Sequence, residues 1–85
     1  MNDLEFDVLD ELYFLIPYSR LKNALKLDEE QIKTTLTSLF RKGYIRCYQS
    51  PTHELFEGEV QLESDFRNYY YLASKEGLMI RHGAR

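Results

Sequence analysis

The chain has 85 residues, of which 44% are hydrophobic and 29% charged, and these values fit one small globular domain over residues 1–85 rather than a disordered tail. No apolar run approaches the ~20 residues that span a bilayer, and the acidic start lacks the basic region of a signal peptide, so a soluble, cytoplasmic protein without a membrane partner is expected. The net charge of −3 is mild evidence against a polyanionic ligand.

The first predicted helix begins at Asn2 or Asp3, either of which can cap it, and runs to about Leu15 because Pro17 ends it. Its core face at helical spacing comprises Leu4, Val8, Leu9, Leu12, Leu15 and Ile16. Three aromatic residues fall outside this face: Phe6, Tyr13 and Phe14. Aromatic side chains on the far side of a helix need another surface to cover them, which either the protein's own β-hairpin or a second subunit could supply. We therefore predict a homodimer whose interface contains these residues and the last helix.

Two further helices with a tight turn between them are predicted over residues 18–43. Ser19 is expected to cap the first of the two, whose inward residues are Leu21, Ala24 and Leu25. After a break at Leu27–Asp28, Asp28 and Gln31 have the spacing of a capping box. The helix that follows has one apolar face of Ile32, Leu36, Leu39 and Phe40, and Gly43 stands where a left-handed residue commonly ends a helix.

The rest of the chain predicts a two-stranded ribbon and a short helix. Strands are expected at residues 44–48 and 67–72, and partial alternation over residues 56–62 suggests that both strands extend into a long ribbon with an acidic tip. In the second strand, Tyr70 and Leu72 are assigned to the core face, and Arg67, Tyr69 and Tyr71 to the opposite face. The tyrosines are interpreted as packing at the base of the ribbon rather than stacking on nucleic-acid bases. Ser74 is expected to cap a last helix from Lys75 to about Arg81.

This order of elements is that of an α+β winged helix. Residues 18–45 resemble bacterial transcriptional regulators of the MarR, PadR and ArsR types, in which a hydrophobic–Ser/Asp break precedes the recognition helix and a Leu…Lys-Gly-aromatic-Ile pattern follows it, here Leu39 and residues 42–45. Residues 71–78 resemble the Tyr-x-Leu-Thr-x-x-Gly pattern that closes the wing in the same proteins. The resemblance implies a three-helix helix-turn-helix core with a two-stranded wing, placing its third helix in the major groove of DNA.

Charge segregation favours the same function. Residues 1–19 hold five acids and residues 47–65 another five, all without Lys or Arg, whereas residues 20–46 hold seven bases against three acids. Helical geometry places a polar set opposite the apolar face of the third helix, with Lys33 at its flank: Glu30, Lys33, Thr34, Thr37, Ser38 and Arg41. Three cations of the preceding helix are expected to contact phosphates: Arg20, Lys22 and Lys26. Sequence-specific binding of double-stranded DNA is the leading hypothesis, and a solvated polar face is the plain alternative.

Two features depart from the DNA-binding pattern. Glu29 and Glu30 occupy the first turn of the third helix, where they complement the helix dipole but would repel phosphates. The expected wing tip is acidic, with Glu54, Glu57, Glu59, Glu63 and Asp65. Such a wing could point away from DNA, neutralise a basic patch on another subunit, or bind protein. The alternative function is therefore a protein–protein interaction module that uses the acidic wing and the first helix.

Catalytic and metal chemistry have no support in the sequence. His53 and His82 lie far apart, with no Cys or His at ligand spacing, so no metal site is expected. The carboxylates are paired with neither a nucleophile nor a glycine-rich phosphate loop, so we expect no enzyme and no cofactor. Cys47 is the only cysteine, which excludes an intrachain disulfide, and its alternation with Ile45 predicts a small buried core residue rather than a reactive thiol.

Overall fold

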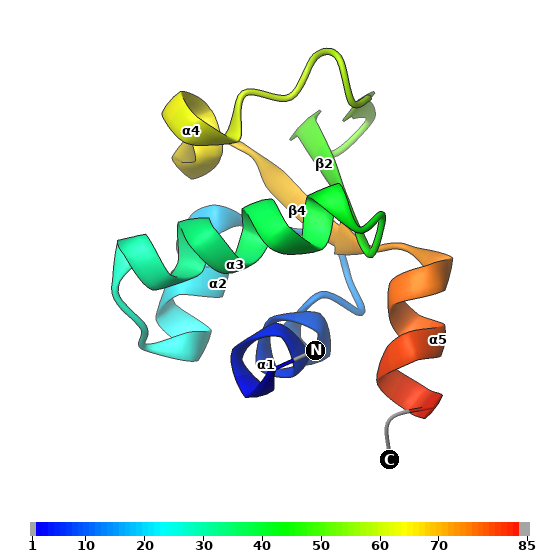
Figure 1. The fold of residues 1–85 in the computed structure, drawn as a ribbon. Helices are drawn as coiled ribbons and strands as arrows, with labels where there is room; N and C mark the ends of the chain where they lie inside the picture. Colours follow the sequence, from blue (N-terminus) through cyan, green and yellow to red (C-terminus); the bar gives the residue numbers. More distant parts are fainter. Residues whose placement is uncertain (1, 84–85) are drawn as a thin grey trace.

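The computed structural model describes residues 2–83 as an α+β domain (Figure 1). This part of the chain comprises five α-helices and a four-stranded antiparallel sheet. The elements in chain order are α1 (Asp3–Glu11), β1 (Ile16–Pro17), α2 (Tyr18–Leu25), α3 (Glu29–Arg41), β2 (Ile45–Ser50), β3 (His53–Leu55), α4 (Leu62–Asp65), the 3₁₀ turn η1 (Phe66–Asn68), β4 (Tyr70–Ala73) and α5 (Lys75–Gly83). No helix within residues 2–83 is long and apolar enough to cross a membrane.

Helix α1 begins as expected and ends earlier than expected. Asn2 caps it, with its side chain accepting from the Glu5 amide at 2.9 Å. The helix ends at Glu11 rather than near Leu15, because the chain must turn to reach the sheet. The carbonyl of Leu12 accepts a hydrogen bond from the Ala73 amide at 2.8 Å, and Ile16 pairs with Tyr71 as part of the unexpected strand β1.

Helix α2 corrects two expectations. It begins at Tyr18, with Pro17 as the N-cap and no side-chain capping bond, so Ser19 is not its cap. The Tyr18 amide donates instead to the carbonyl of Tyr69, because the entry to α2 is still attached to the sheet. Leu21 is fully buried, but Ala24 is exposed, since so short a helix turns only a narrow face towards the core.

Helix α3 follows the predicted signals at both ends. The capping box is confirmed, with the Gln31 amide donating to Asp28 at 2.8 Å and the Asp28 amide donating to Gln31 at 3.3 Å. Gly43 has φ +78°, the left-handed conformation that glycine adopts without strain. Ile32, Leu36 and Leu39 are fully buried and Phe40 is half-buried, so the expected apolar face is the observed one.

The sheet differs from the expected two-stranded ribbon. Its strand order is β1-β4-β2-β3, and residues 56–62 do not extend the strands but turn and lead into α4. The second strand begins at Tyr70 rather than at Arg67, which lies in η1. The assigned faces are reversed: Tyr71 is fully buried and Tyr69, just before β4, is 6% exposed, whereas Tyr70 and Leu72 are half-buried. Tyr71 pairs directly with Cys47 in β2, which places both on the core face. The burial of Tyr69 and Tyr71 confirms that these rings pack within the protein.

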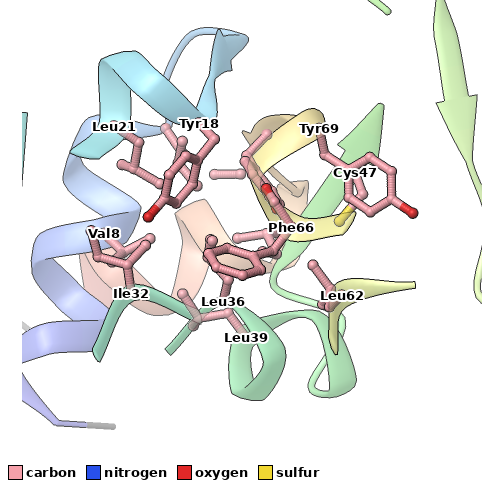
Figure 2. Close-up of a cluster of buried hydrophobic side chains, with 14 of the residues drawn as sticks. Val8, Tyr18, Leu21, Ile32, Leu36, Leu39, Cys47, Leu62, Phe66 and Tyr69 are labelled. Atoms are coloured by element: carbon pink, nitrogen blue, oxygen red, sulfur yellow. The ribbon is translucent and has the colours of Figure 1, made fainter. Parts of the chain in front are cut away.

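The core lies between the helices and one face of the sheet, and Figure 2 shows the ring of Phe66 among side chains of α2, α3 and α4. Phe66 meets Tyr18 edge-on at a centroid distance of 5.2 Å. Because Phe66 and Leu62 are both nearly buried, the segment after β3 is anchored beside α3 rather than left to extend into solvent. This anchoring determines what surrounds the outer face of α3.

Helix α5 closes the domain against α1. Ser74 is its cap, as expected, accepting from the Gly77 amide at 3.0 Å, and its hydroxyl also donates to the carbonyl of Gly43 at 2.6 Å. The helix extends to Gly83, slightly beyond the expected end. Arg81 is 9% exposed and makes two hydrogen bonds to Asp10 of α1, at 2.6 and 2.7 Å. The last helix is therefore fixed by a two-pronged charged contact as well as by packing.

Candidate nucleic-acid interface

The outer face of α3 borders a surface hollow of about 430 Å³. All six residues that helical geometry places on this face line the hollow: Glu30, Lys33, Thr34, Thr37, Ser38 and Arg41. The sequence did not indicate the other two lining residues, Lys42 and Glu63. Lys42 follows directly after the helix, whereas Glu63 comes from α4 across the hollow. The face is therefore a real surface feature, bounded on one side by an acidic residue from a distant part of the chain.

Lys33 is the best-placed cation in the centre of α3, and two carboxylates already surround it. Its Nζ lies 3.0 Å from Glu63 Oε1 and 3.6 Å from Glu30 Oε2. Its side chain is only 17% exposed and lies near the ring of Phe66. The hydrogen bond to Glu63 is the main reason that the pKa of Lys33 is raised above its ordinary value. The charge is present but neutralised in this conformation.

Ser38 and Lys42 are both held by Glu5 of α1. Ser38 Oγ donates to Glu5 Oε2 at 2.9 Å, and Lys42 Nζ lies at the same distance from the same oxygen. Burial of Glu5, which is 4% exposed, would raise the pKa of its carboxyl. The hydrogen bonds from Lys42, the Asn2 amide and Ser38 outweigh that effect and lower the pKa below its ordinary value. The sequence interpretation missed Glu5, although it precedes Val8 and Leu9 by three and four residues and so shares their inward face.

Thr34 and Arg41 are the groups on α3 best able to meet a ligand. Both are exposed, and within residues 2–83 Arg41 has no ion pair. Thr37 is half-buried, and its hydroxyl donates back to the carbonyl of Lys33 at 2.8 Å. The hydroxyl oxygen of Thr37 can still accept a hydrogen bond from a ligand, but its proton is already donated to this carbonyl.

The cations of α2 lie outside the hollow. Arg20 and Lys26 are exposed, and neither has an ion pair within the described part of the chain. Lys22 is half-buried, and its charge contributes to lowering the pKa of Glu29. Lys26 takes φ +56° and ends α2 at the turn into α3. These cations are placed for contacts beside the α3 face rather than within it.

Glu29 forms an ion pair within the protein. Arg67 of η1 makes two hydrogen bonds to its carboxylate, at 2.7 and 3.0 Å, and the guanidinium carbon of Arg67 lies 4.6 Å from the centre of the Phe66 ring. The bond from Arg67 is the main reason that the pKa of Glu29 is lowered. The first turn of α3 is thus joined to η1, and one of the two carboxylates in that turn is occupied within the protein.

The acidic segment takes a course that the sequence did not predict. It does not point away from the helix-turn-helix but returns along α3, where Glu57 and Glu63 line a second hollow, of about 320 Å³, with Thr37, Phe40 and Arg41. In Figure 1 this segment crosses above α3 between β3 and α4. Neither helical nor strand periodicity marks such a return, because it depends on the turn after Leu55 and on the burial of Leu62.

The three aromatic residues of the expected dimer surface differ in their surroundings. The guanidinium of Arg81 lies over the ring of Phe6, 5.3 Å from its centre, and the hydroxyl of Tyr13 lies 3.2 Å from His82 Nε2. The protein's own last helix therefore partly covers both. Phe14 is 79% exposed. The homodimer stays a prediction, now centred on Phe14.

Cys47 packs in the hydrophobic core. Cys47 is fully buried, as expected, and burial raises the pKa of its thiol to about 12. Among residues 2–83 no three or more His, Cys, Asp or Glu side chains come together as a metal-binding group. Comparisons with protein-family models, with curated proteins and with solved structures give no match. The resemblance to bacterial regulators therefore depends on the motif residues themselves.

Proposed function

We propose that this chain is a winged-helix domain of a transcriptional regulator that acts in the cytoplasm without catalysis and binds double-stranded DNA through α3. The order of α1, α2, α3, β2, β4 and α5 supports this reading, with β1 and β3 as additional strands of the sheet. The connection between α2 and α3 is short, as a helix-turn-helix requires.

The observation that carries the proposal is the outward face of α3, which brings six polar residues to one hollow. An α-helix fits the major groove, where a threonine hydroxyl can meet base edges and an arginine fork can bind guanine or a phosphate. Thr34 and Arg41 have those properties on this face, and both are exposed. Arg20 and Lys26 of α2 would supply phosphate contacts, which position a protein without specifying sequence.

A salt titration of binding to random-sequence duplex DNA tests the proposal. If Arg20, Lys26 and Arg41 each neutralise one phosphate, the slope of log K against log salt concentration is about −2.7, at about 0.9 per contact. Arg41→Glu should abolish most of this binding. Lys75→Glu is the matched control, because it reverses one exposed charge at the start of α5, away from the hollow. An equal loss of DNA affinity in Arg41→Glu and Lys75→Glu would show that net charge alone causes the effect. Absence of binding by the unmodified protein at low salt would refute the proposal.

A protein-interaction module remains the second candidate, and exposed aromatic side chains favour it. Phe56 at the start of the acidic segment is 65% exposed, and Phe14, between α1 and β1, is 79% exposed. Exposed aromatic residues beside acidic ones suit a partner surface with apolar and basic groups. This reading predicts that charge reversal at Arg41 has no functional effect, whereas Phe56→Ser removes binding to the partner.

A further inference from the structure

The segment of residues 56–65, called the acidic strap here, lies against the candidate DNA-binding face. It contains Glu57, Glu59, Glu63 and Asp65, and no Lys or Arg. Its first turn is closed by two hydrogen bonds: the Phe56 amide donates to Glu59 Oε1 at 3.0 Å, and the Glu59 amide donates to the Phe56 carbonyl at 2.7 Å. Its far end is anchored by the buried side chain of Leu62. The strap therefore begins with an internally closed turn, and its far end is anchored beside α3.

The strap engages the same residues that a DNA ligand would use. Glu63 binds Lys33 at 3.0 Å, and Glu63 also borders the hollow that contains Thr34 and Arg41. Glu57 and Glu63 border the second hollow, which shares Thr37 and Arg41 with the first. We infer that the strap is an autoinhibitory element, in which Glu63 occupies Lys33 and the strap carboxylates repel phosphates from α3. This inference rests on the proposed DNA-binding function.

The contact is weak enough to be reversible. The Glu63 side chain is 87% exposed, so water and salt screen its attraction to Lys33. When Glu63 is removed, Lys33 keeps its place near the Phe66 ring and 3.6 Å from Glu30. The Glu30 side chain is 79% exposed, so water and salt screen this second ion pair as well. Glu57 of the strap still lines the second hollow together with Thr37 and Arg41, so part of the negative charge beside α3 remains. Loss of Glu63 should therefore leave Lys33 with only the screened pair to Glu30, so that it can contact a phosphate, without removing the whole negative field.

The salt slope distinguishes release of Lys33 from a mere change in net charge, because it reports the number of phosphate contacts. In Glu63→Gln, a released Lys33 adds one contact, so the salt slope becomes steeper by about 0.9 and affinity at low salt rises by up to about fivefold, the worth of one exposed ion pair. Glu76→Gln removes one exposed carboxylate from the first turn of α5, outside the hollows, and should leave the slope unchanged. Lys33→Gln is tested both alone and combined with Glu63→Gln. Alone it should change the DNA affinity and the salt slope little, and in the double variant it should cancel the increases that Glu63→Gln causes.

Fluorescence anisotropy of a labelled random-sequence duplex, titrated with NaCl, measures affinity and slope for all five proteins. Steeper and tighter binding by Glu63→Gln, reversed by Lys33→Gln and absent from Glu76→Gln, supports the autoinhibitory strap. Binding by the unmodified protein with the same slope and affinity in Glu63→Gln overturns the strap and leaves the proposed function standing. Absence of binding by both the unmodified protein and Glu63→Gln overturns the strap and the proposed function together. Thermal unfolding confirms that each variant is folded.

Discussion

Replacement of Glu5 by Gln tests how the fold positions α3. Glu5 of α1 is 4% exposed, and one of its oxygens accepts both from Ser38, in the last part of α3, and from Lys42, just after that helix. The substitution keeps the shape of the side chain and allows its remaining oxygen to accept from the Asn2 amide. It removes the negative charge, and it places an amide donor or a neutral acceptor against the Lys42 ammonium.

The expected loss is about 2 kcal/mol in the free energy of unfolding, because a hydrogen bond to a charged group contributes about 1.5–3 kcal/mol. The upper end of that range does not apply, since the Lys42 side chain is 42% exposed and water screens its charge. For a domain of this size the loss corresponds to a fall in Tm of roughly 10 °C. Urea denaturation followed by circular dichroism measures it, with Glu11→Gln at the exposed end of α1 as the control.

The pH dependence follows from the lowered pKa of Glu5. A carboxyl whose pKa is lower in the folded protein than in the unfolded chain stabilises the fold fully above the unfolded pKa, and this contribution disappears as pH falls through the folded pKa. The gap between the protein and Glu5→Gln should therefore be constant at neutral pH and close progressively below the ordinary value of 4.5. A gap that is absent at neutral pH, or that is unchanged in acid, would contradict this role of Glu5.

Two further predictions concern packing. Gly77→Ala should lower the free energy of unfolding by about 3 kcal/mol in urea denaturation, because a Cβ there would overlap the carbonyl of Tyr44. Gly58→Ala is the control, since Gly58 has open space around it. Equal stability of the two variants would contradict the packing of α5 against Tyr44. Cys47 should react with a thiol reagent only as fast as the domain unfolds, because it is buried and the pKa of its thiol is about 12; rapid modification of the folded protein would show that the sheet face is open.

Local signals predicted the elements that depend on neighbouring residues. The capping box at Asp28, the stripe from Ile32 to Leu39 and the left-handed Gly43 lie within one helix and its ends, so a short stretch of sequence determines them. The polar face of α3 follows from the same periodicity, which is why all six of its predicted residues line one hollow.

The features that the sequence did not predict depend on contacts between segments that are distant in the chain. Strand β1 exists because Ile16 pairs with Tyr71, and the pattern around Pro17 gives no sign of it. The faces of β4 are set by pairing of Tyr71 with Cys47 in the neighbouring strand. The return of the acidic strap and the capture of Lys33 by Glu63 depend on a turn and on a buried leucine rather than on a period. The sequence predicted which residues of α3 face outward, but it did not predict the side chains from other segments that contact them.

The salt dependence of duplex DNA binding by the unmodified protein tests the central claim most directly. Binding of a random-sequence duplex that weakens with added NaCl, with a slope of about −2.7 and most of the affinity lost in Arg41→Glu, is the expected result. Binding that is absent at low ionic strength, or that survives Arg41→Glu with an unchanged slope, would contradict DNA recognition through α3.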